Sequence, residues 1–173
     1  MKISLWLLPC FDQALGLFQQ IESFSWERKK APFPPHLTLY SPIQADPDEL
    51  LESQRRHCQS QTPLELQRRG ISHSEAHYRA IVIDLLPSPA LLAWQQTLQQ
   101  TYFPTDSRTY APHLSLVYDL MNLSEREALV PQARAEETYR FDRLLAMRTE
   151  SSDPAGHRYQ EWEQLWELPL EGK

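Results

Sequence analysis

The chain has 173 residues, a formal net charge of −6, and hydrophobic and charged fractions of 41% and 23%. These values are ordinary for a folded protein with a sizeable core. The negative charge repels long polyanions at a distance and argues against a genome-scale nucleic-acid binder, although a local pocket can still hold a small phosphate ligand.

The chain opens with a short apolar segment, residues 3–8, which ends at Pro9 and is soon followed by Asp12. This segment is too short to span a bilayer and lacks a convincing signal-peptide cleavage site, so we expect a buried first strand and no membrane association. Cys10 and Cys58 show neither zinc nor redox spacing, which predicts two reduced thiols in a cytoplasmic protein.

In the first third of the chain, Asp12 can cap a helix whose apolar residues recur on one face. Residues 25–35 combine three prolines with basic side chains and are predicted to form a loop. A strand at residues 36–40 follows, and Asp46 or Asp48 then begins a polar helix.

The middle of the chain is predicted to hold two strands, residues 64–71 and 78–86, the second of them rich in Ile and Val. Ser88 followed by Pro89 is typical of a helix start. A Pro-containing loop at residues 102–112 then leads into a strand at residues 113–117.

In the last third, Ser124 and Glu127 have the spacing of a capping box, and Pro131 leaves the length of the following helix open. Residues 139–148 and 158–168 are predicted to form two long strands, joined by a hairpin around residues 153–156. The four glycines of the chain provide no Gly-rich phosphate loop.

Strands and helices therefore mingle without the regular alternation of a doubly wound sheet. We predict an α+β fold over residues 1–173 as a single bilobal domain. Each of its two lobes would carry a sheet.

A repeated phrase is the strongest functional signal in the sequence. Residues 35–39 read Pro-His-Leu-Thr-Leu and residues 112–116 read Pro-His-Leu-Ser-Leu. Residues two apart in a strand face the same side, so His36 and Thr38 share one face, as do His113 and Ser115, while the leucines enter the core. A single His-Leu-Thr would most often be a buried histidine with local hydrogen bonds, but two matching copies favour a shared site.

Two imidazoles and two hydroxyls suit the hydrolysis of a cyclic phosphodiester. Histidine titrates near neutrality, so one ring can take a proton from water while the other gives a proton to the leaving ring oxygen. The hydroxyls of Thr38 and Ser115 can donate hydrogen bonds to the non-bridging phosphate oxygens. This chemistry needs neither a metal nor another cofactor.

The paired motifs resemble those of the two-histidine (2H) phosphoesterases, and residues 112–118 resemble the second motif of the plant and yeast cyclic phosphodiesterases. The opening Ser4-Leu5-Trp6 is similar as well. The resemblance implies a bilobal, duplicated fold with two antiparallel sheets flanked by helices and the active-site cleft between the lobes. It also implies metal-independent hydrolysis of 2′,3′-cyclic nucleotides or ADP-ribose 1″,2″-cyclic phosphate.

The resemblance also implies roles for individual residues. His36 and His113 would be the acid–base pair, with His113 activating water and His36 protonating the leaving oxygen, and Thr38 and Ser115 would bind the phosphate. Tyr118 matches an aromatic residue near the phosphate or base. Its position five residues after His113 requires a bend or a strand end after Val117 to turn it towards the site.

Other polar residues are weaker candidates. Arg108 and Tyr110 precede the second motif and are candidates for substrate binding, as is the basic run Arg28–Lys30 before the first motif, although charge runs are usually solvated. His73 and His77 flank Glu75, but this segment lies between two predicted strands, so we expect a solvated turn and no metal site.

Two alternatives compete with a small-molecule cyclic phosphodiesterase. One is a 2H enzyme acting on RNA ends, as a 2′–5′ RNA ligase or an RNA phosphodiesterase; the acidic balance argues against it. The other is a nucleotide-binding module without catalysis. We expect the protein to act as a monomer on a small cyclic phosphate or nucleotide.

Overall fold

The computed structural model describes residues 1–150 and 158–172. The predicted hairpin at residues 153–156 lies outside these ranges. Within them the chain forms seven strands, four α-helices and three short 3₁₀ helices, in this order: β1 Ile3–Pro9, α1 Phe11–Glu27, β2 Leu37–Ile43, α2 Pro47–Ser60, β3 Leu64–His73, 3₁₀ His77–Arg79, β4 Ile81–Leu85, α3 Pro89–Tyr102, β5 His113–Val117, α4 Leu123–Leu129, 3₁₀ Val130–Gln132, β6 Thr138–Arg148, 3₁₀ Tyr159–Glu161, β7 Glu163–Pro169.

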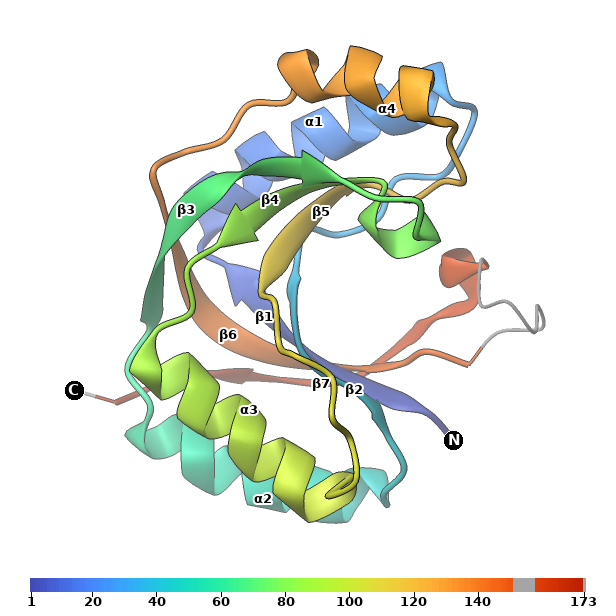
Figure 1. Cartoon of the computed structure of the whole chain (residues 1–173). Coiled ribbons are helices and arrows are strands. Elements are labelled where there is room, and N and C mark those ends of the chain that lie inside the picture. Colours follow the sequence, from blue (N-terminus) through green and yellow to red (C-terminus); the bar gives the residue numbers. More distant parts are fainter. Residues whose placement is uncertain (151–157, 173) are drawn as a thin grey trace.

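The described strands pair in one antiparallel sheet rather than in the two separate sheets that the sequence predicts. The strand order is β1-β2-β5-β4-β3-β6-β7, and β1 also pairs with β6, so six strands close into a β-barrel (Figure 1). The long strand β6 makes this closure possible. Its residues Thr138 to Phe141 pair with β3, and its residues from Phe141 to Arg148 pair with β1.

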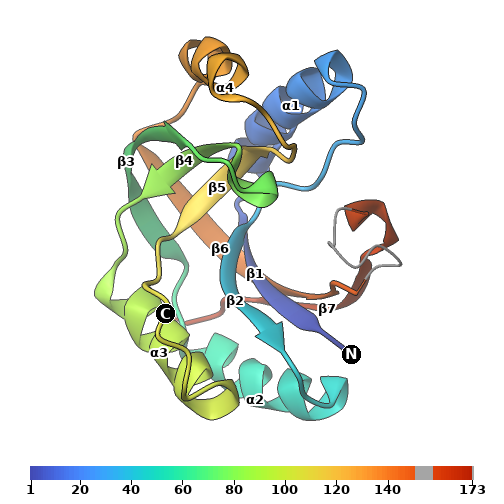
Figure 2. The same cartoon turned by 45° about the vertical axis from the view of Figure 1, so that its right-hand side comes forward.

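The four helices lie on two sides of this sheet (Figures 1 and 2). Helices α1 and α4 lie together at one end in both views, and α2 and α3 at the other. Their apolar faces join the leucines and isoleucines of the strands in one hydrophobic cluster. This packing occupies the outer face of the strands and leaves their inner, concave face for other side chains.

The side chains of β1 point alternately to the outer and the inner face of the sheet. Ile3, Leu5 and Leu7 are fully buried in the hydrophobic cluster under the helices. Ser4 and Trp6 point to the opposite, inner face, where both line a cavity. The buried first strand expected from residues 3–8 is therefore confirmed, and it contributes to both faces.

Several helix starts follow the capping rules. Asp46 accepts hydrogen bonds from the backbone N–H groups of Asp48 and Glu49 at the start of α2. Ser88 caps α3 by accepting from the N–H of Leu91, with Pro89 in the first turn. Asn122, not Ser124, makes the capping box of α4 with Glu125, because the helix begins two residues earlier than the sequence pattern suggests.

Other boundaries differ from the predictions. Asp12 lies in the first turn of α1 and not at its cap, which is Cys10; a carboxylate there still favours the helix dipole. Residues 77–79 form a 3₁₀ turn, so β4 begins at Ile81. A similar turn at residues 159–161 delays β7 to Glu163.

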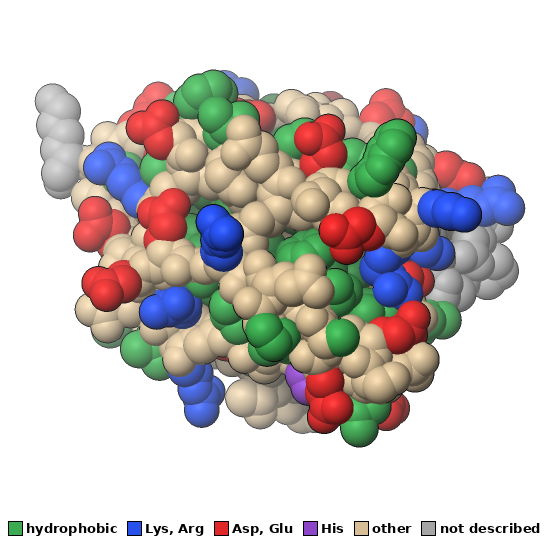
Figure 3. All heavy atoms as spheres, turned by 90° about the horizontal axis from the view of Figure 1, so that it is seen from above, with side chains coloured by type: hydrophobic (Ala, Val, Ile, Leu, Met, Phe, Trp, Pro, Cys, Tyr) green, Lys and Arg blue, Asp and Glu red, His purple; other side chains and the backbone are tan. Residues whose placement is uncertain are grey.

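The space-filling view from above shows acidic and basic side chains interspersed over the face that α1 and α4 cover (Figure 3). None of the helices in the described ranges has the length and hydropathy needed to cross a membrane.

Candidate active site

The two repeated phrases meet at a single backbone pairing. Strands β2 and β5 run antiparallel, and Leu37 pairs with Leu114. These are the residues that follow the two histidines, so the two phrases face each other across a local twofold relation. In this register His36 lies next to the position of Ser115, and Thr38 next to that of His113. Both leucines are buried on the outer face.

On the inner face, both histidines and both hydroxyl residues line one cavity of about 210 Å³. The remaining walls come from strands and turns far apart in the sequence. The cavity is lined by Ser4, Trp6, His36, Thr38, Ser41, Tyr78, His113, Ser115, Tyr118, Thr149 and Trp162. We call this space the histidine cavity.

Both imidazoles are held by the same local contact. The Nδ1 atom of His36 lies 2.7 Å from the carbonyl oxygen of Pro34, and that of His113 lies 2.8 Å from the carbonyl oxygen of Ala111. A proline stands between each histidine and its carbonyl partner and holds the preceding residue extended. Because a carbonyl only accepts, each Nδ1 must carry a proton, which leaves the Nε2 lone pair of the neutral ring free to act in proton transfer.

His36 is the more enclosed of the two histidines. Its ring stacks on the indole of Trp6, with centroids 3.6 Å apart and planes 11° from parallel. Its Nε2 lies 3.1 Å from the hydroxyl oxygen of Tyr118, which donates to it when the ring is neutral. Burial lowers the pKa of His36 to about 4; the carbonyl of Pro34 opposes this shift and nearby His113 adds to it.

His113 is half-buried and has a more polar environment. Burial also lowers its pKa below the ordinary value, and the hydrogen bond to the Ala111 carbonyl opposes that shift. The guanidinium of Arg79 lowers the pKa further, while the carboxylate of Asp84 raises it. The two rings therefore share a tautomer but differ in their surroundings.

The two hydroxyl residues of the motifs differ in their contacts. The Ser115 hydroxyl donates to the carbonyl oxygen of Tyr78 at 2.7 Å, so it must rotate before it can donate to a ligand. The Thr38 side chain lines the histidine cavity, and its backbone carbonyl accepts from the Tyr110 hydroxyl at 3.1 Å.

Tyr118 reaches the cavity because β5 ends at Val117, as the sequence required. Its ring stacks on Phe33, with centroids 3.6 Å apart and planes 7° from parallel. Burial is the main cause that raises the pKa of its hydroxyl, so the group stays protonated and can serve as a hydrogen-bond donor.

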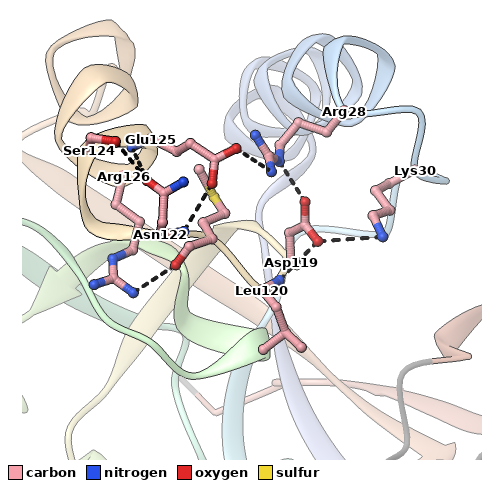
Figure 4. Close-up of polar contacts among 9 residues, drawn as sticks. Arg28, Lys30, Asp119, Leu120, Asn122, Ser124, Glu125 and Arg126 are labelled. Atoms are coloured by element: carbon pink, nitrogen blue, oxygen red, sulfur yellow. Dashed lines mark hydrogen bonds and ion pairs between the residues drawn. The ribbon is translucent and has the colours of Figure 1, made fainter.

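The residue after Tyr118 is fixed by ion pairs (Figure 4). One carboxylate oxygen of Asp119 lies 2.6 Å from Nε of Arg28, and the other lies 3.4 Å from Nζ of Lys30. Arg28 also reaches Glu125 at 3.5 Å. The basic run before the first motif is thus used by Arg28 and Lys30 to hold the segment that carries Tyr118.

Arg108 and Tyr110 line a second cavity and not the histidine cavity. This adjoining cavity has a volume of about 230 Å³ and shares Thr38, Ser41 and His113 with the first. The Arg108 guanidinium binds the Asp106 carboxylate and the backbone carbonyl of Ser41.

Several residues that line the histidine cavity lie outside the two repeated phrases, so the motif does not reveal them. Ser4 and Trp6 could be found from the alternation of β1, since the sequence already marks residues 3–8 as a strand. Tyr78 lies in a turn that the sequence predicts as a strand, and Trp162 lies between the 3₁₀ turn at residues 159–161 and β7. Trp162 packs against the hydrophobic cluster, as does Trp166.

His73 is the last residue of β3, Glu75 lies in the connection to β4, and His77 begins the 3₁₀ helix there. Glu75 is exposed and lies 3.8 Å from Arg126. Among the described residues, no group of three or more His, Cys, Asp or Glu side chains is placed to hold a metal ion.

Comparisons with known proteins identify the family. A model of the 2′-5′ RNA ligase superfamily matches residues 15–152. No curated protein sequence matches the chain. The solved structure of TT0787 of Thermus thermophilus is similar, with a TM-score of 0.63, 13% identity and 100% of each chain covered.

Structures of E. coli LigT are also similar in fold. The complex with NADP+ gives a TM-score of 0.57 at 16% identity, with 98% of each chain covered. The complex with 3′-AMP gives 0.56 at 14% identity, with 98% of this chain and 97% of that chain covered.

The burial of His36 predicts a pH-dependent stability. The ring titrates near 6.5 when unfolded and near 4 when folded, so its contribution is present above pH 6.5 and is lost as pH falls towards 4. The free energy of unfolding should drop over this interval by roughly 3 kcal/mol more in the wild type than in His36→Gln. Urea unfolding at several pH values measures this difference; parallel curves for the two proteins would contradict it.

Proposed function

The chain belongs to the 2′-5′ RNA ligase superfamily, and from this membership we propose that it is a 2H phosphoesterase that hydrolyses a small cyclic phosphodiester to a phosphomonoester. The substrate class is a 2′,3′-cyclic nucleotide or ADP-ribose 1″,2″-cyclic phosphate. One observation carries the proposal: two histidines, each fixed through Nδ1, share a cavity with two hydroxyl residues.

The proposed reaction uses both rings. One neutral Nε2 takes a proton from water as the water oxygen bonds to phosphorus. The bond between phosphorus and a ring oxygen breaks, and the other, protonated Nε2 gives its proton to that oxygen. The product is an open monoester, and the two rings have exchanged protonation states. The step uses the two imidazoles alone for proton transfer.

The surroundings of the rings suggest which one is the base. Burial lowers the pKa of His36 to about 4, so its ring is neutral at pH 7. We assign the base to His36 and the acid to His113, where bound phosphate raises the pKa of the half-buried ring. This assignment reverses the roles that family resemblance implies.

The neighbouring hydroxyls would stabilise the phosphate. Thr38 can donate to a non-bridging oxygen directly, and Ser115 can do so after rotating away from the Tyr78 carbonyl. The Tyr118 hydroxyl donates to Nε2 of His36. When water displaces this contact, the hydroxyl can donate to the water or to the phosphate.

Nucleotide-like ligands are supported by the fold comparison. E. coli LigT has been solved with NADP+ and with 3′-AMP, the second of which has the form of a ring-opened product. The family description also supports the second candidate, an RNA-end 2H enzyme that acts as a 2′-5′ RNA ligase or RNA phosphodiesterase.

The duplicated, two-lobed organisation over residues 1–173 is also a proposal. It is supported by the pairing of Leu37 with Leu114, which relates the two phrases by a local twofold. The placement of α1 and α4 at one end and of α2 and α3 at the other fits the same symmetry (Figure 1).

The function is tested with 2′,3′-cyclic AMP and ADP-ribose 1″,2″-cyclic phosphate in the presence of EDTA. Wild type should form a phosphomonoester from at least one of them. His36→Ala and His113→Ala should each lower kcat/KM by about 100-fold or more, because each removes one proton transfer. His73→Ala, which lies outside both cavities, is the matched control. Unchanged turnover in either active-site variant would refute the mechanism.

The acid–base assignment is tested with a 2′,3′-cyclic phosphorothiolate whose leaving atom is sulfur. A thiolate leaves without being protonated, so the general acid is dispensable. His113→Ala should recover most of its lost activity on this substrate relative to the oxygen compound, whereas His36→Ala should not. Recovery in His36→Ala alone would show the opposite assignment.

A further inference from the structure

A second cavity opens beside the histidine cavity, on the side of His113. Three residues line both spaces, so a ligand bound at the histidines can extend into the second one. The rest of its wall comes from β2, the 3₁₀ turn before β4, α3 and the loop before β5. The residues specific to this adjoining cavity are Leu39, Tyr40, Arg79, Gln95, Asp106, Arg108, Thr109, Tyr110 and Ala111.

Among the charged side chains that line the adjoining cavity, one cation is available to bind a ligand. The Asp106 carboxylate is paired with the Arg108 guanidinium at 2.6 Å and also accepts from the Tyr40 hydroxyl. These contacts lower the pKa of Asp106, so it stays ionised and neutralises Arg108. Arg79 has a weaker partner, because its Nη2 lies 3.9 Å from Asp84, which lines neither cavity.

Arg79 also lies close to the reaction site. Its guanidinium is near enough to His113 to lower the pKa of that ring. Its side chain is 39% exposed and its Nε has no hydrogen-bond partner in the described part of the chain. Arg79 is therefore a cation in the wall of the adjoining cavity, near His113 and without a close ion pair.

Gln95 adds a neutral polar group. The residue is 6% exposed, on the buried face of α3, and it lines the adjoining cavity. A side-chain amide in this wall can both donate a hydrogen bond to a ligand and accept one from it.

The shape of a nucleoside cyclic phosphate explains how these groups could be used. Its reactive phosphate bridges the 2′ and 3′ oxygens, and its 5′ carbon lies at the other end of the ribose. With the cyclic phosphate at the two histidines, whatever is attached at the 5′ position must leave the histidine cavity. The adjoining cavity is the space that continues from it.

We propose that the adjoining cavity binds a second phosphate, attached on the 5′ side of the reacting ribose, through Arg79, with Gln95 hydrogen-bonding to the same ligand. This inference rests on the proposed function and narrows its substrate class. The preferred substrates carry a phosphate beyond the cyclic one. That phosphate comes either from an RNA chain or from a diphosphate, as in ADP-ribose derivatives.

The experiment compares two product-like ligands, 3′-AMP and adenosine 3′,5′-bisphosphate, by calorimetry. Wild type should bind the bisphosphate about tenfold more tightly or better, as expected for a charge-assisted contact to arginine. Arg79→Gln should reduce this advantage to less than about threefold, and Arg79→Lys should keep part of it. Arg69→Gln, an exposed arginine on β3, is the control and should keep all of it.

A wild-type protein that binds both ligands equally well, or an Arg79→Gln variant that keeps the full advantage, would overturn the inference. Circular dichroism checks that each variant is folded. The experiment measures binding, so it tests the inference independently of catalysis. A failure to hydrolyse any cyclic substrate would count against the proposed function alone.

The source of the second phosphate is decided by kinetics in the wild type. The values of kcat/KM are compared for 2′,3′-cyclic AMP, its 5′-phosphorylated form, a dinucleotide ending in a 2′,3′-cyclic phosphate, and ADP-ribose 1″,2″-cyclic phosphate. The inference expects 2′,3′-cyclic AMP to be the poorest of the four. A dinucleotide preferred over the others would identify RNA ends, and preference for the ADP-ribose compound would identify a diphosphate.

Discussion

The site depends on the pairing of Leu37 with Leu114 across two antiparallel strands. Because strand residues alternate between faces, burying these two leucines under the helices turns the four flanking residues to the inner face. Those four residues are the two histidines and the two hydroxyl residues, and they line one cavity. Moving either strand by one residue would send the histidines into the hydrophobic core, so the packing of the leucines fixes the register of the site.

The local symmetry of the two motifs is broken by what surrounds each ring. His36 lies between Trp6 and Tyr118, in an aromatic environment that favours the neutral ring. His113 lies at the border of the two cavities, within the electrostatic reach of Arg79 and Asp84. A reaction that needs one base and one acid is served by such a difference, because two identical rings would compete for the same protonation state.

Much of the site could be predicted from the sequence because it is determined by residues only a few positions apart. The motif residues, their shared face and the turn that brings Tyr118 inward all follow from strand alternation over a few positions. The caps of α2 and α3 are equally local. The single sheet could not be predicted, because it depends on β6 pairing with β1 and β3, and no local pattern specifies such distant partners. The same holds for Arg79 and Gln95, which reach the adjoining cavity only through the tertiary fold, and for the contacts of Arg28 and Lys30 with Asp119.

In the proposed mechanism, two backbone carbonyls hold both histidines so that their Nε2 atoms are available to one phosphate. Nitrogen-15 NMR of histidine-labelled protein at pH 7, with and without inorganic phosphate, tests this most directly. The rings of His36 and His113 should both carry their proton on Nδ1, and phosphate should shift the Nε2 resonances of both. A proton on Nε2 in either neutral ring, or a response of only one ring to phosphate, would contradict it.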